Sequence, residues 1–154
     1  MDDFYNLSLD EILEILKTTV NCLKKQIDDI KNENTKAKQH ARSKSLAKSI
    51  AVIEDIFEKL HIIIDDDYEN ITVEDEYYDL THQEIIKIIY DALLNQEAII
   101  DDIETQMSID PKSTALRNEI HRALDLRDII IDMISDFNIE MCDFREHAKY
   151  LLSI

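Results

Sequence analysis

The chain has 154 residues, enough for one compact domain or two very small ones. Its net charge of −17 excludes general binding to nucleic acids, which needs Lys and Arg to displace counterions, and argues against binding to an anionic membrane surface. Hydrophobic residues make up 45% of a chain that has no Gly. We therefore expect long helices rather than a sheet protein, whose hairpin turns usually require Gly.

The sequence shows no sign of secretion or of a membrane span. The N-terminus is acidic where a signal peptide would be basic, and no apolar run approaches the ~20 residues of a membrane span. Cys22 and Cys142 match neither a zinc motif nor a redox pair, so we expect two buried, reduced thiols. These features predict a cytoplasmic protein.

The two halves of the chain resemble each other at an offset of 73 residues. The alignment has no gaps over residues 2–30 and their counterparts, and it continues more weakly beyond them. Ser8 and Glu11 correspond to Thr81 and Glu84, and both pairs have the spacing of a capping box. We therefore predict an internal duplication, with helices that begin directly after Ser8 and Thr81.

Hydrophobic residues at steps of three and four predict four helices. In chain order these helices cover residues 9–33, 43–65, 82–107 and 113–137. The third helix carries Gln96 at the seam position where the first helix carries Leu23. The apolar stripe continues beyond Phe137, so the tail either extends the fourth helix or folds back as a fifth.

These elements predict an all-α fold in which two tandem helical hairpins form a four-helix bundle. Its parts are a first hairpin repeat (1–73), a second repeat (74–137) and a C-terminal helical extension (138–154), within one compact domain. An extended two-repeat array that dimerises to bury its remaining apolar face is the competing arrangement.

Charge is shared unevenly along the chain. Residues 1–73 contain 10 Lys/Arg and 15 Asp/Glu, whereas residues 74–154 contain 7 and 19. Segment 36–48 is basic and is interpreted as a solvated turn and helix start, or as a contact with an anion or an acidic partner. Segment 65–79 is acidic, lacks any basic residue, and is interpreted as a solvated connection between the repeats.

The acidic segment also contains a degenerate EF-hand pattern. Asp65, Asp67 and Glu69 occupy loop positions one, three and five, and Glu76 falls at position twelve. Asn70 replaces the usual Gly at position six. The sequence leaves open whether this segment binds Ca²⁺, and it indicates no other metal and no cofactor.

A short motif on the fourth predicted helix suggests an enzymatic alternative. The run from Arg117 through Asn118 to His121 resembles the Arg-Asn…His motif of HEPN-type ribonuclease toxins, which are also small helical bundles. The resemblance implies RNA cleavage through Arg117 and His121. The competing interpretation is an exposed helix start.

Tyrosines and carboxylates supply the candidate protein-binding residues. Aromatic side chains surrounded by acidic ones are one way to build a binding hot spot, and rows of carboxylates on helices can imitate the phosphates of DNA. The candidates are Tyr68, Tyr77, Tyr78, Asp101, Asp102, Asp128 and Asp132.

The pattern favours a non-enzymatic, acidic protein-binding module directed at a basic partner surface. Such a module would act as a stoichiometric inhibitor, an immunity-type protein or an adaptor, in one version as a DNA mimic. It would bind neither nucleic acid nor a membrane directly. A structural protein that forms a helical homodimer and the HEPN-like ribonuclease are the alternatives.

Overall fold

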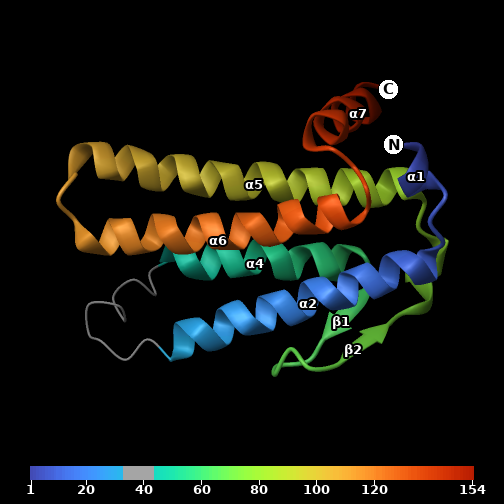
Figure 1. Ribbon diagram of the computed structural model, residues 1–154, viewed down its shortest axis with the longest axis horizontal. Helices are drawn as coiled ribbons and strands as arrows, with labels where there is room; N and C mark the ends of the chain where they lie inside the picture. The colour runs from blue at the N-terminus through green and yellow to red at the C-terminus, as the bar shows by residue number, and fades with distance from the viewer. Residues whose placement is uncertain (33–43) are drawn as a thin grey trace.

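The computed structural model describes residues 1–32 and 44–154, and most of it is helical (Figure 1). In chain order its elements are α1 (Asp2–Tyr5), α2 (Leu9–Lys31), α4 (Lys44–Lys59), β1 (Ile62–Ile64), β2 (Ile71–Val73), the 3₁₀ helix η1 (Asp75–Asp79), α5 (His82–Ile109), α6 (Thr114–Asp136) and α7 (Met141–Ser153). The four long helices lie side by side, and each runs opposite to the one before it (Figure 1). Most of the basic segment 36–48 lies outside the described residues.

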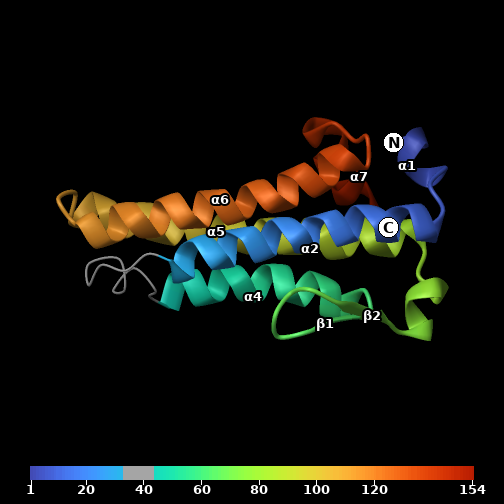
Figure 2. The same ribbon diagram turned by 60° about the horizontal axis from the view of Figure 1, so that its bottom comes forward.

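The core fills the space between the long helices. Helix α6 packs against α2, α4 and α5, and α4 packs against α5 as well (Figure 2). Positions on the predicted seams are buried, among them Leu16, Leu23, Ile53, Phe57, Leu93, Ile130 and Met133. A smaller apolar cluster of Ile100, Ile103 and Ala123 lies between α5 and α6. Removal of these stripes from water is the main stabilising contribution to the helix packing.

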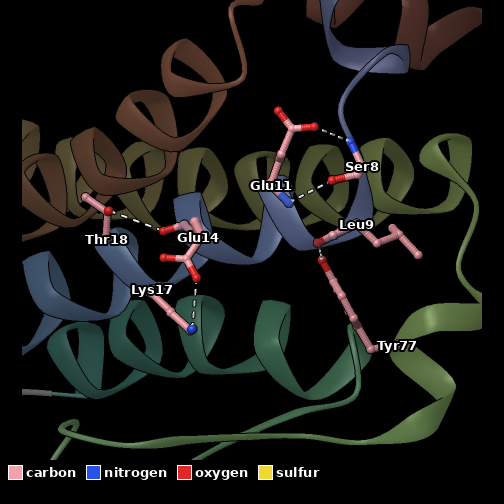
Figure 3. A network of polar contacts seen from close by, with 7 residues as sticks. All are labelled: Ser8, Leu9, Glu11, Glu14, Lys17, Thr18 and Tyr77. Atoms are coloured by element: carbon pink, nitrogen blue, oxygen red, sulfur yellow. Dashed lines mark hydrogen bonds and ion pairs between the residues drawn. The ribbon is translucent and has the colours of Figure 1, made fainter.

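Both predicted capping boxes are confirmed. The Ser8 Oγ accepts from the Glu11 backbone N–H, and the Glu11 carboxylate accepts from the Ser8 N–H, both at 3.1 Å (Figure 3). Thr81 and Glu84 make the same two bonds, again at 3.1 Å. Each box satisfies two backbone donors that a helix start leaves without intrahelical partners. Helices α2 and α5 therefore begin where the sequence predicts.

The prediction that Gln96 occupies a seam position of its helix is also confirmed. The Gln96 side chain is fully buried. Its Nε2 donates to the Ser49 Oγ at 3.1 Å and to the Ala123 backbone carbonyl at 2.9 Å, so one side chain connects α4, α5 and α6. The Gln96 Oε1 is buried without a hydrogen-bond partner among the described residues.

The all-α prediction is wrong for residues 60–73. The second helix, expected to reach residue 65, ends at Lys59, and β1 pairs with β2 in an antiparallel hairpin. Just past the helix end, His61 has a φ of 61°, which turns the chain out of the helix. The isoleucines of β1 are β-branched and favour a strand, where they pack against the core on alternate residues.

The hairpin turns without glycine. The Asp65 carboxylate accepts from the Glu69 backbone N–H at 2.9 Å and from the Asn70 side-chain amide at 3.2 Å. Tyr68 adopts the left-handed conformation, with a φ of 56°, that glycine usually supplies. Side-chain hydrogen bonds thus stabilise a turn that the absence of Gly seemed to exclude.

The tail folds back as a separate helix, which resolves the two options for residues 138–154. Helix α6 ends at Asp136, and Asn138 has a φ of 61°, which breaks the helical path. Helix α7 then packs against α5 and α6 through Phe144, Ala148 and Leu151. The chain termini lie at the same end of the molecule (Figure 1).

The expectation of buried thiols is wrong. Cys22 and Cys142 are both exposed, and each lies on the solvent side of its amphipathic helix.

None of the helices in the described part of the chain combines the length and apolarity that crossing a bilayer requires.

Candidate functional site

The hairpin turn and η1 carry a concentration of negative charge, which we call the hairpin surface. Its exposed carboxylates are Asp66, Asp67, Glu74, Asp75, Glu76 and Asp79. Residues 60–86 include no Lys or Arg. Among the side chains of residues 1–30 and 46–154, none of these six carboxylates forms an ion pair with a cationic group. The charge on this surface is therefore largely uncompensated.

The hairpin turn is attached to α2 by one ion pair. The Lys24 Nζ lies 2.7 Å from the Glu69 carboxylate. The hydrogen bond from the Glu69 backbone N–H lowers the pKa of the Asp65 carboxyl, and the Asn70 amide groups and Lys24 act in the same direction. Asp65 therefore stays ionised to lower pH than a free aspartate, and the turn keeps its charge.

Tyr68 lies half-buried at the turn, close to α4. Its hydroxyl donates to the Glu54 carboxylate at 3.5 Å, a long hydrogen bond. Burial raises the pKa of the Tyr68 hydroxyl, and the nearby Glu54 carboxylate raises it further. Tyr68 thus presents only part of its ring to a partner.

Tyr77 and Tyr78 differ in exposure although they are adjacent. The Tyr77 side chain is fully buried and belongs to the core, so its ring is not part of the surface on which the sequence analysis placed it. Tyr78 is 51% exposed and packs edge-on against Tyr77, with ring centroids 5.2 Å apart. Of the two, Tyr78 is the residue that a partner can reach.

The remaining four candidates are exposed on α5 and α6, and we call them the α5–α6 surface. They are Asp101, Asp102, Asp128 and Asp132. Asp128 lies 3.9 Å from the Arg127 guanidinium, and Asp102 accepts from the Gln106 amide at 3.3 Å. Part of the charge on this surface is therefore balanced or hydrogen-bonded by neighbours on the same helix.

The seven candidates do not form one site. The β-hairpin lies on the far side of α4 from α5 and α6 in both views of the molecule (Figures 1 and 2). The tyrosines and the α5–α6 carboxylates thus belong to two separate surfaces. A partner that covers one of them need not touch the other.

The EF-hand interpretation of residues 65–76 is wrong in its geometry. An EF-hand loop connects two helices, whereas strands β1 and β2 flank this turn. The Asp65 carboxylate is engaged in the turn itself. Among the described residues, the one set of three potential ligands that converges is Glu140, Cys142 and Asp143, all exposed, at the start of α7.

Arg117 and His121 are both exposed on α6, one helical turn apart. The Arg117 guanidinium donates to the Pro111 carbonyl at 3.2 Å, which holds it against the α5–α6 turn. Neither residue lines any of the three hollows described next. The ribonuclease interpretation stays a prediction.

Three shallow hollows differ in their charge. One contains Lys48 and Asp55 between α4 and α5, and another contains Lys17 and Glu69 beside α2, so each holds charges of both signs. The third lies between α4 and β1 and is charged only by Glu54, Glu58 and Glu74. Sequence reasoning missed this third hollow because it assigned Ile62–Ile64 to a helix; the β-branched run was the available signal.

Comparison of the chain with protein-family models, with curated proteins and with solved structures finds no match.

Proposed function

We propose that this chain is a non-enzymatic binding module whose hairpin surface binds a basic surface on another protein. One observation carries the proposal: six exposed carboxylates on the turn, directly after β2 and on η1 have no ion pair to a cationic side chain in the described part of the chain. An excess of like charge reduces the stability of a compact protein through self-repulsion. A basic partner would relieve that repulsion.

Electrostatic complementarity acts mainly on recognition. A negative surface accelerates the encounter with a positive one and disfavours acidic proteins as partners. Because the carboxylates are exposed, dissolved salt screens them, and binding should weaken as ionic strength rises. A stoichiometric inhibitor, an immunity-type protein and an adaptor all share this behaviour.

The test is capture of a partner by tagged protein from nuclease-treated lysate, with two charge variants. The hairpin variant is Asp66→Asn/Asp67→Asn/Asp75→Asn/Asp79→Asn, and the matched variant is Asp101→Asn/Asp102→Asn/Asp128→Asn/Asp132→Asn. We expect a basic protein to be retained at low salt by the wild type and the α5–α6 variant, and lost by the hairpin variant. Equal retention by the wild type and both variants would contradict the proposal.

A DNA mimic is the version of this function that uses the α5–α6 surface. The exposed aspartates of that surface lie on two antiparallel helices, where rows of carboxylates could imitate the phosphates of DNA. In the same experiment, loss of the partner from the α5–α6 variant alone would favour the DNA mimic over the hairpin surface.

A helical homodimer is the second candidate function, and exposed apolar residues at the end of α7 support it. Tyr150, Leu152 and Ile154 are 60%, 58% and 80% exposed. Burial of such side chains across a two-fold axis would give an association that salt does not weaken. Light scattering during gel filtration tests it: a dimer that persists at high salt supports the candidate, and a monomer at every concentration removes it.

We also infer that the fold is a duplicated helical hairpin, with the long helices forming a four-helix bundle. Residues at the 73-residue offset are buried in both halves, for example Phe4 with Tyr77 and Leu16 with Ile89. The short helices α1 and η1 occupy corresponding places before the two capping boxes. A superposition of the two halves should align residues 2–30 with residues 75–103; any other offset would contradict the duplication.

A further inference from the structure

The hollow between α4 and β1 has a volume of about 260 Å³ and an apolar base. Phe57 and Ile62 line it with nearly fully buried side chains, and Ile64 is half-buried. Ile63, also part of the lining, is 53% exposed. The hollow therefore presents hydrocarbon surface to solvent. We call it the α4–β1 groove.

Three glutamates complete the lining of the α4–β1 groove. Glu54 and Glu58 lie one turn apart on α4, and Glu74 directly follows β2. All three are exposed, and the one hydrogen bond to them from a described side chain is the long contact from the Tyr68 hydroxyl to Glu54. The groove thus combines an apolar base with three carboxylates that form no ion pair with the described cationic side chains.

Lys59, which follows Glu58 in the sequence, does not pair with these carboxylates. Lys59 lies 2.9 Å from Asp55 and 3.5 Å from Asp91 of α5, and these two contacts raise the pKa of its ammonium group. Lys59 is therefore engaged with Asp55 of its own helix and with Asp91 of α5 instead of the groove. The two other hollows, by contrast, contain their own lysines.

We propose that the α4–β1 groove receives a lysine or arginine side chain from the basic partner, an inference that rests on the proposed function. The aliphatic part of such a side chain would cover Phe57 and the β1 isoleucines. Its charged end would lie among Glu54, Glu58 and Glu74. A long cationic side chain is the occupant that satisfies both properties of the groove, because an apolar residue would leave the carboxylates unpaired and a short cation would leave the base exposed.

A hexalysine peptide is a suitable probe, with binding followed by NMR of protein labelled at the isoleucine methyl groups. At low ionic strength we expect the largest shift changes at Ile62, Ile63 and Ile64. A peptide of six diaminopropionic acid residues carries ammonium groups on shorter stems, so it should bind about threefold or more weakly if stem contacts contribute.

Two triple variants separate the groove from net charge. Glu54→Gln/Glu58→Gln/Glu74→Gln should weaken hexalysine binding by about tenfold, whereas Glu14→Gln/Glu140→Gln/Glu146→Gln, with the same change in charge, should weaken it by about twofold at most. All six glutamates are exposed, so both variants should fold.

The outcomes distinguish this inference from the proposed function. If both triple variants lose affinity equally, or if the peptide binds without shifting the β1 methyl groups, the groove is not the binding site, although a basic partner can still bind the hairpin surface. If the wild type does not bind hexalysine at all, the groove proposal fails and the proposed function loses its support as well.

Discussion

The Tyr77 hydroxyl donates a hydrogen bond of 2.6 Å to the backbone carbonyl of Leu9, the first residue of α2 (Figure 3). The ring that carries this hydroxyl is fully buried. One side chain therefore connects η1, which follows the acidic hairpin, to the start of α2. This contact positions the hairpin surface against the helices.

Replacement of Tyr77 by Phe should lower the free energy of unfolding by about 1 kcal/mol, because it removes this bond and keeps the buried ring. Tyr78→Phe is the matched control, since the neighbouring ring is half-exposed and its hydroxyl makes no hydrogen bond among the described residues. Urea denaturation measures both. Equal stability of the two variants would show that the bond contributes nothing.

The same residue predicts a loss of stability at alkaline pH. Burial raises the pKa of the Tyr77 hydroxyl well above its ordinary value, with smaller contributions from Tyr78 and Asp10. As pH rises above about 10, the unfolded chain releases the Tyr77 proton while the folded chain keeps it, so stability falls. Below about pH 10, the contribution of the protonated Tyr77 hydroxyl to stability is fully present.

The comparison that checks this is denaturation of wild type and Tyr77→Phe across the alkaline range. The variant should lose less stability. The rest of the decline should reflect the other groups whose pKa values are raised, namely Tyr5, Tyr68, Lys24 and Lys59. If the free energy of unfolding fell with pH in parallel for the two proteins, Tyr77 would titrate equally in the folded and unfolded states, which would contradict the prediction.

The capping box at α5 supports a second stability prediction. Glu84→Ala removes the carboxylate that accepts from the Thr81 N–H, and Thr81→Ala removes the hydroxyl that accepts from the Glu84 N–H. Each should cost about 1 kcal/mol. Gln83→Ala, in the same exposed first turn, should be neutral. The prediction fails if all three variants melt at the wild-type temperature.

The buried side chain of Gln96 supports a third stability prediction. Its Oε1 has no partner among the described residues, whereas its Nε2 bonds to the fully buried Ser49. Removal of both polar side chains at once leaves neither unpaired, and the Ala123 carbonyl that loses its bond from Gln96 lies inside α6, where it accepts an intrahelical bond. Gln96→Leu/Ser49→Ala should therefore be at least as stable as wild type. Ser49→Ala alone should be less stable by about 1 kcal/mol. Thermal melting separates these outcomes; a double variant less stable than Ser49→Ala would contradict the account.

Much of the helical part of the fold could be predicted from local patterns. The starts of α2 and α5 follow from side chains three residues apart, and the buried seams follow from helical periodicity. Exposure of Asp101, Asp102, Asp128 and Asp132 follows from the same periodicity.

The hairpin could not be predicted in the same way. Its turn depends on hydrogen bonds that the Asp65 carboxylate accepts and on a left-handed Tyr68. Neither has the strong sequence signature of an Asn-Gly turn. The Tyr77 hydroxyl contacts Leu9, which is far away in the sequence. The acidic residues around Tyr77 in the sequence instead suggest that its ring is exposed. The α4–β1 groove forms between two elements that the periodicity merged into one helix.

The central claim is that the hairpin surface binds a basic protein through uncompensated charge. Its most direct test is the dissociation constant of the captured partner, measured by calorimetry over a range of salt concentrations for the wild type and for Asp66→Asn/Asp67→Asn/Asp75→Asn/Asp79→Asn. We expect wild-type affinity to fall steeply with salt, and the variant to bind weakly with a much flatter dependence. A wild-type affinity that does not change with salt, or a variant that binds as tightly as the wild type, would contradict the claim.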